Sequence, residues 1–211
     1  MDGNGEEGLY GSKAAWPAGM LGLVRASLEV FFETDEVHQS LELLSTSVVS
    51  AMRDGGNLFF LGNGGSFADA QHFAGELQGR FLFDREPLPC FALGSNPAAL
   101  TAIANDYSYS DIFIRELKAS LTSRCVVIGL STSGRSRNVL EALQFALTRS
   151  SEIWLLTGEI RPEIDQRIKT VCFPSRETPR IQEMQKIFGH LLCERVESEL
   201  FGSAPIDSTL S

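Results

Sequence analysis

Five short apolar runs, separated by longer stretches of helical periodicity, constrain the fold of this 211-residue chain more than any other feature. Each run is almost continuously apolar, which is typical of strands that helices bury on both faces. Strands that alternate with helices in this way predict an α/β domain built around a five-stranded parallel sheet. The runs span residues 58–61, 89–93, 125–130, 153–157 and 170–173.

The length of the chain suits one domain with a full hydrophobic core and falls short of the usual length of two. Both ends differ from the middle in composition, since the start is rich in Gly and acidic residues and the end in Ser and Pro. Such ends are commonly mobile. We therefore expect a flexible segment over residues 1–17, one domain over residues 18–201 and a flexible tail over residues 202–211.

Two helices are expected ahead of the first strand, at about Leu21 to Phe32 and Asp35 to Arg53. In the second, apolar residues such as Leu41 and Leu44 recur at helical spacing. Two helices exceed what a minimal sheet unit needs, so we expect them to pack against another subunit. In the alternative, which the sequence leaves open, they only cover one face of the sheet.

The net charge of −9 at pH 7 argues against a protein that binds nucleic acid, because no excess of Lys and Arg neutralises phosphates. A small anionic ligand remains compatible with this charge, since backbone N–H groups and hydroxyls bind anions locally.

The cysteines and the apolar content indicate the expected compartment. The four cysteines form no CxxC pair, so neither a zinc ribbon nor a redox motif is indicated, and buried reduced thiols are expected. No apolar run reaches about 18 residues, and no basic segment followed by an apolar one opens the chain. We expect a cytoplasmic protein that does not bind membranes.

A glycine-rich loop, GNGGS at residues 62–66, follows the first apolar run, and a helical pattern begins at Ala68. Glycines remove the Cβ obstruction and permit positive φ, so backbone N–H groups can converge on an anion at a helix N-terminus. The loop does not match GxGxxG, so no dinucleotide site is expected. Taken alone, it fits an anion site and a plain tight connection equally well.

A second loop, STSGRS at residues 131–136, separates the third run from a helix expected at Asn138 to Leu147. Its four hydroxyls offer donors to phosphate oxygens at a helix N-terminus, where the macrodipole favours negative charge. Helix capping alone would need one or two of them. Because both loops leave the carboxyl ends of parallel strands, we expect them to face one crevice that holds a phosphate.

Four separated motifs resemble the phosphoheptose isomerases of the sugar isomerase (SIS) domain family. They are GNGGS at 62–66, DAQHFAGE at 69–76, STSG at 131–134 and RIQE at 180–183, and the resemblance runs over about residues 41–199. It implies a single SIS domain with a flavodoxin-like three-layer sandwich, extended by N-terminal helices. It also implies an aldose–ketose isomerase that converts D-sedoheptulose 7-phosphate to D-glycero-D-manno-heptose 7-phosphate through a cis-enediol. A zinc ion and a homotetramer with active sites at subunit interfaces are implied as well.

The resemblance also implies the site residues. Glu76 would be the base and His190 the acid. The implied metal ligands are His72, Glu76, Gln182 and His190. The implied substrate contacts are Asn63, Gly64, Gly65, Ser66, Arg80, Asn105, Asp106, Ser131, Thr132, Ser133, Ser136 and Gln182.

The residues themselves partly support this set. His72 and Glu76 are four apart on one helix, so they project from the same face. Gln182 and His190 would stand about 12 Å apart along one helix, too far to reach a single ion unaided. Histidine, carboxylate and amide ligands suit Zn²⁺ if they converge from different elements or subunits. The third histidine, His38, is expected to face solvent.

Two positions depart from the family pattern. Pro179 stands where Asp is common, which puts an auxiliary acid-base role there in doubt, and Gln185 stands where His is common. A proline in the first turn of a helix is structurally benign.

The rival interpretation is a non-catalytic SIS-domain protein of the type that associates with a replication initiator. Such proteins are similar to this chain at residues 70–74, 100–106 and 180–184. They typically lack the glutamate and the final histidine of the isomerases. Glu76 and His190 are both present here, which favours an enzyme.

Overall fold

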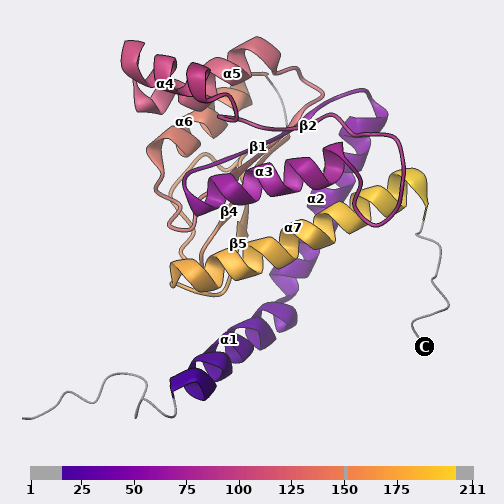
Figure 1. The fold of residues 1–211 in the computed structure, drawn as a ribbon, viewed down its shortest axis with the longest axis vertical. Coiled ribbons are helices and arrows are strands. Elements are labelled where there is room, and N and C mark those ends of the chain that lie inside the picture. The colour runs from indigo at the N-terminus through magenta and orange to yellow at the C-terminus, as the bar shows by residue number, and fades with distance from the viewer. Residues whose placement is uncertain (1–15, 150–151, 203–211) are drawn as a thin grey trace, which may run out of the picture.

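The structure, a computed structural model, describes residues 16–149 and 152–202 (Figure 1). Nearly all of the predicted terminal segments, 1–17 and 202–211, lies outside these residues, and the first helix already begins at Trp16. The helices are α1 Trp16–Glu33, α2 Asp35–Arg53, α3 Gly65–Gln78, α4 Pro97–Asp106, α5 Ile112–Ser120, α6 Arg137–Ala146 and α7 Thr178–Phe201, with short 3-10 turns η1 Tyr109–Asp111 and η2 Leu147–Arg149.

The strands form one parallel sheet, in the order β2-β1-β3-β4-β5. The predicted five-stranded parallel sheet is therefore confirmed. The central strands β1 and β3 are buried at every position. Their bounds are β1 Leu58–Gly62, β2 Cys90–Ala92, β3 Val126–Leu130, β4 Glu152–Thr157 and β5 Lys169–Cys172.

The expectation that each run is buried on both faces is wrong for β2. This strand lies at the sheet edge, where it pairs only with β1, and the side chain of Phe91 is 40% exposed. An edge strand has a neighbour on one side only, so its side chains are covered less completely.

Helices cover both faces of the sheet and complete three layers (Figure 1). One hydrophobic core joins α2, α3 and α7 to the sheet, and the other joins α5 and α6 to the opposite face. The bounds of α2 match those predicted, and its buried residues, among them Leu44 and Val48, contact the sheet side. This helix therefore covers a sheet face, while its expected packing against another subunit stays a prediction.

The first helix behaves differently from α2. Figure 1 shows α1 extending beyond the three layers, and four of its large apolar side chains are exposed. The exposed fraction is 69% for Leu21 and between 50% and 54% for Leu23, Val30 and Phe32. Because a monomer rarely leaves so much apolar surface on one helix, α1 has the character of a contact surface.

Helices α3 and α7 run side by side in the same direction (Figure 1). Gln182 lies beside Gly65, Lys186 pairs with Asp69, and Gly189 packs on the ring of Phe73. The two helices are therefore parallel and in a fixed register, and this register determines which of their residues are in contact. The contact at Gly189 allows the close approach, since a Cβ there would overlap the buried Phe73 ring.

Replacing Gly189 by Ala should lower the free energy of unfolding by about 1–3 kcal/mol, because the added methyl group overpacks the α3–α7 contact. Gly75→Ala is the matched control, since a Cβ at that exposed helical position meets nothing within 4 Å. The control should be stabilised by up to about 1 kcal/mol through helix propensity. Urea unfolding of both variants measures the difference, and equal stabilities would contradict the packing described.

The four cysteines are free thiols, and Cys90, Cys125 and Cys193 are buried, as expected from the sequence. Cys172, at the end of the edge strand β5, is only half-buried. Burial raises the pKa of the Cys90 thiol to about 12, which keeps it protonated and unreactive. Within residues 16–149 and 152–202, no helix combines the length and the apolar character needed to cross a membrane.

Candidate active site

His72, Glu76 and His190 converge where α3 passes α7, and we call them the histidine cluster. One ligand atom from each lies within 4.8 Å of the others. The Nε2 atoms of His72 and His190 are 2.7 Å apart, and His72 Nε2 lies 3.4 Å from Glu76 Oε1. The i,i+4 spacing places His72 and Glu76 on one face of α3, and the parallel packing brings His190 opposite them.

The environment of His190 favours the neutral imidazole. Burial lowers its pKa below the ordinary 6.5, and the nearby His72 and Lys186 lower it further, against the opposing carboxylates of Glu76 and Asp69. A neutral ring carries one free lone pair at neutral pH, so it can accept a proton or bind a metal. All three cluster residues are partly exposed, so a ligand can reach them.

The glycine loop, residues 62–66, follows β1 and opens α3. Gly64 has a φ of +55°, and Gly65 leaves the space that the Gln182 side chain occupies. Ser66 is buried in the first turn of α3. Gly64 gives the positive φ that the sequence predicts for such a turn, and Gly65 also allows the close approach of α7.

The hydroxyl loop, residues 131–136, follows β3 and opens α6. Ser131 Oγ donates to Ser136 Oγ at 3.0 Å, and the Arg135 N–H donates to Ser133 Oγ at 3.3 Å. Gly134, with a φ of +64°, turns the chain so that its N–H bonds the Ser131 carbonyl. The hydroxyls thus gather around the N-terminus of α6, where an anion is favoured.

Asn138 and Tyr109, which sequence reasoning missed, both bond Asn63 of the glycine loop. The amides of Asn63 and Asn138 exchange two hydrogen bonds of 2.8 Å, and the Tyr109 hydroxyl donates to Asn63 Oδ1 at 2.9 Å. These bonds place the two loops side by side, as expected from the neighbouring strands β1 and β3, and the crevice that would hold a phosphate stays a prediction. Asn138 lies in the first turn of α6, directly after the hydroxyl loop. This position was the sequence signal that could have identified Asn138 as part of the site.

Gln182 is the predicted ligand that this chain does not bring to the histidine cluster. Its side chain lies against Gly65, about two turns of α7 before His190. There it lines a mostly apolar groove of about 660 Å³ between α1, α3 and α7, together with Val24, Leu28 and Pro179. Gln182 therefore faces an open surface.

Three further predicted substrate contacts stand apart from the cluster and from both loops. Asn105 Nδ2 donates to Asp106 Oδ1 at 2.9 Å at the exposed end of α4, and Arg80 is exposed just beyond α3. In the described part of the chain, no hydrogen bond or ion pair connects these three residues to the cluster or the loops.

The two departures from the family pattern lie at the start and in the middle of α7. Pro179 falls in the first turn of α7, where it is tolerated as predicted. Gln185 is fully buried and its Nε2 donates to the Leu156 carbonyl of β4 at 3.0 Å. It therefore ties α7 to the sheet and does not face the histidine cluster.

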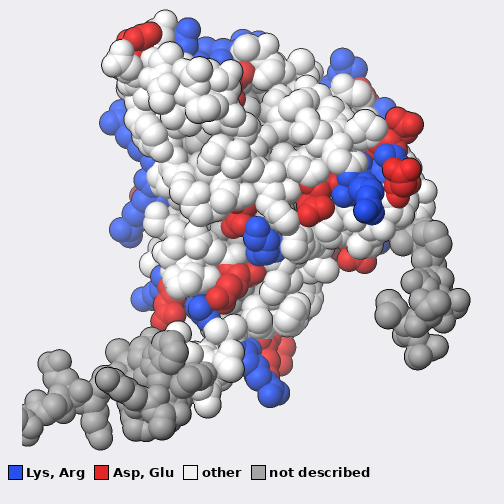
Figure 2. Space-filling view, in the orientation of Figure 1, with Lys and Arg blue, Asp and Glu red and all other residues white. Residues whose placement is uncertain are grey.

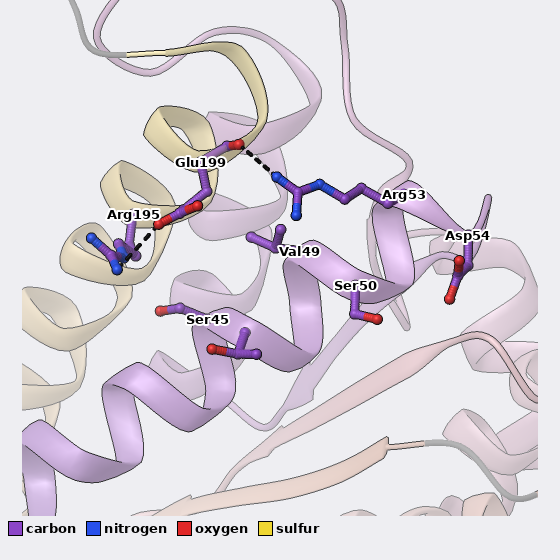
Figure 3. A pocket seen from close by; sticks show the side chains of 8 residues that line it. Ser45, Val49, Ser50, Arg53, Asp54, Arg195 and Glu199 are labelled. Carbon is purple, nitrogen blue, oxygen red and sulfur yellow. Dashed lines mark hydrogen bonds and ion pairs between the residues drawn. The ribbon is translucent and has the colours of Figure 1, made fainter.

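A separate pocket of about 300 Å³ lies between α2 and α7 (Figure 3). Arg53 donates to the Glu199 carbonyl at 3.0 Å, and Arg195 lies 3.1 Å from the Glu199 carboxylate. The Ser45 hydroxyl donates to the Leu41 carbonyl of its own helix. These polar groups bind one another across the two helices. We therefore interpret the pocket as part of the α2–α7 contact and not as a ligand site.

Lys and Arg on the face that carries α3 and α7 lie among Asp and Glu, and no continuous basic field covers this face (Figure 2). His38 is exposed on α2, as expected, and contributes nothing to the cluster.

Comparisons with known proteins agree on one family. The model of the SIS domain family matches residues 22–158. The phosphoheptose isomerase of Aneurinibacillus thermoaerophilus is 39% identical over 175 residues, which are 82% of this chain and 88% of that protein. The phosphoheptose isomerase of Rhodospirillum rubrum is 44% identical over 72% of this chain and 82% of its own length. Among solved structures, the phosphoheptose isomerase of Neisseria gonorrhoeae superposes with a TM-score of 0.77 at 29% identity, over 89% of this chain and all of that one.

Proposed function

The chain belongs to the SIS domain family, among its phosphoheptose isomerases, and we propose that it converts D-sedoheptulose 7-phosphate to D-glycero-D-manno-heptose 7-phosphate. The observation that carries this proposal is the convergence of His72, Glu76 and His190 on two adjacent helices. Relatives with the isomerase name share about 40% of their residues with this chain over most of its length. The rival, a non-catalytic SIS-domain protein, does not account for an intact carboxylate–histidine set.

An aldose–ketose isomerisation moves a proton between C1 and C2 through a cis-enediol, so it needs a base for the carbon and an acid for the oxygens. Glu76 is the base in this proposal, because its carboxylate is partly exposed and accessible. His190 carries protons between O1 and O2, since its lowered pKa leaves the ring neutral and able to exchange a proton.

The phosphate would lie in the hydroxyl loop, far from the reacting carbons. Ser131, Thr132, Ser133 and Ser136 supply hydroxyls there, and the N-terminus of α6 adds a favourable potential. Ser66 of the neighbouring glycine loop would add a fifth hydroxyl. Binding energy from this remote group orients the open-chain sugar for the proton transfer.

The histidine cluster also fits a divalent metal ion. Two imidazole nitrogens and a carboxylate oxygen within 4.8 Å form a donor set that suits Zn²⁺. We propose His72, Glu76 and His190 as ligands from one chain, with Gln182 as a fourth. Bound zinc would polarise the sugar carbonyl.

The fourth ligand requires a second subunit in this proposal. Gln182 stands about 12 Å along α7 from His190, and it faces the open groove beside α1. A neighbouring copy that covers this groove and the apolar face of α1 would carry its own histidine cluster to Gln182. We therefore propose active sites that are shared between subunits, in the homotetramer that the family resemblance implies. We also propose a cytoplasmic enzyme, because the thiols are free.

Replacing Ser136 by Ala should raise KM about tenfold with little change in kcat, since one donor to a charged group is lost. Ser120→Ala is the matched control, because among the described residues that exposed hydroxyl bonds only the Glu116 carbonyl of its own helix. Steady-state kinetics over a range of substrate concentrations measure both constants. An unchanged KM in Ser136→Ala would remove the phosphate from this loop.

The activity itself is tested by incubating purified protein with sedoheptulose 7-phosphate, with and without a chelator, and following aldose formation by NMR. Loss of turnover on chelation and its return on adding zinc would support the metal site. Absence of turnover under every metal condition would favour the non-catalytic binding protein.

A further inference from the structure

We propose that Arg85 and Glu197 are positioning residues that hold Glu76 against His190, a role that rests on the proposed function of Glu76 as base. Their ion pair is the most deeply buried one in the described part of the chain, with the two side chains 2% and 1% exposed. Neither residue belongs to the motifs by which the sequence resembles its family. The pair lies where α3 ends, just beyond the histidine cluster.

Arg85 binds the end of α3 through its backbone. Its guanidinium donates to the carbonyl of Glu76 itself at 3.0 Å, to that of Leu77 at 2.8 Å and to that of Gly79 at 3.0 Å. The last carbonyls of a helix have no partner within the helix, and a cation there also complements the macrodipole. Arg85 thus fixes the turn of α3 from which the Glu76 side chain projects.

Glu197, on α7, binds Arg85 and the backbone that follows α3. Its carboxylate accepts the N–H groups of Phe81 and Leu82 at 3.0 and 2.8 Å, and Arg85 Nε at 2.9 Å. Glu197 follows His190 by seven residues, so both lie on the same face of α7, two turns apart. The pair therefore connects the backbone at Glu76 to the helix that carries His190.

A second ion pair lies on the other side of the histidine cluster. Lys186 Nζ is 2.5 Å from Asp69 Oδ1, one turn before His72 and His190 along the two helices. The Lys186 side chain is 38% exposed, so this contact is weakened by water. Of the two ion pairs that flank the cluster, Arg85–Glu197 is the one that is shielded and held at a fixed geometry.

The geometry depends on the planar guanidinium, which donates in several directions at once. A lysine at position 85 would keep the charge but could not hold Glu197 and the three carbonyls together. The last turn of α3 would then shift relative to α7, and the Glu76 carboxylate would move with it. A displacement of about 1 Å at a reacting group can cost about 100-fold in rate.

The test compares Arg85→Lys and Glu197→Gln with the wild-type enzyme in steady-state turnover of sedoheptulose 7-phosphate. We expect kcat to fall about 10- to 100-fold. KM should stay within about twofold, because the hydroxyl loop lies at the far end of the substrate. Leu117→Ala is the control: it opens a cavity in the core on the opposite sheet face and should keep kcat while lowering stability.

Circular dichroism establishes that each variant is folded at the assay temperature. If Arg85→Lys and Glu197→Gln unfold, Glu197→Asp replaces them, because it keeps the charge on a shorter side chain. A kcat like that of Leu117→Ala, or a rise in KM as large as the fall in kcat, would overturn the positioning role. An inactive wild-type enzyme would instead overturn the proposed function, before any variant is compared.

Discussion

Glu76→Gln should reduce turnover of sedoheptulose 7-phosphate by about 10³-fold or more, because general-base catalysis contributes 10²–10⁴ and no other carboxylate of this cluster replaces it. The amide keeps the shape of the carboxylate and one oxygen that can bind a metal ion. It cannot take the proton from carbon. Substrate binding should change by less than about threefold, since the phosphate contacts lie in the hydroxyl loop. Steady-state kinetics and calorimetric titration with substrate measure the two effects separately.

Glu194→Gln is the matched control for this variant. Glu194 is an exposed residue of α7, one turn beyond His190, and it is not among the charged groups that shift the pKa of His190, so its replacement removes one negative charge and no cluster ligand. It should turn over substrate like the wild-type enzyme. Turnover of Glu76→Gln at the level of Glu194→Gln would assign the base to another residue.

Mixed oligomers of Glu76→Gln and Gln182→Ala subunits should regain activity that neither variant has alone. If each site takes Glu76 from one subunit and Gln182 from another, some sites of a mixed oligomer contain both native residues. For random assembly of equal amounts this fraction is about one quarter. Co-refolding the two variants and assaying the mixture measures the recovery.

The control for the mixing experiment is a mixture of Glu76→Gln and His190→Asn subunits. These two residues come from the same chain in the histidine cluster, so no mixed site regains both. This mixture should stay inactive. Recovery there, or no recovery with Gln182→Ala, would show that the site is not divided between subunits as proposed.

The sequence predicted the parts of this structure that follow from local patterns. The apolar runs predicted the five parallel strands, and helical spacing predicted α2 over Asp35–Arg53. The i,i+4 spacing of His72 and Glu76 predicted their common face, and the glycines predicted the positive φ in the loop at 62–66. Each of these signals lies within one element, where periodicity and turn chemistry decide the structure.

The remaining features depend on how elements pack, which local patterns do not reveal. The contact of His190 with the cluster follows from the register between α3 and α7, and that register follows from contacts such as Gly189 on Phe73. The partners Arg85 and Glu197 are 112 residues apart, and a lone charged residue in sequence usually indicates exposed surface. The bond between Asn63 and Asn138 likewise joins loops from different strands.

The base role of Glu76 can be followed directly in the conversion of sedoheptulose 7-phosphate in D₂O, monitored by NMR. A cis-enediol route through the Glu76 carboxyl exchanges the transferred proton with solvent, so we expect D-glycero-D-manno-heptose 7-phosphate that carries deuterium at C2. In Glu76→Gln both the conversion and the labelling should disappear. Product formed without solvent deuterium would exclude the enediol route through Glu76, and no product from the zinc-supplemented wild-type enzyme would exclude the isomerase function.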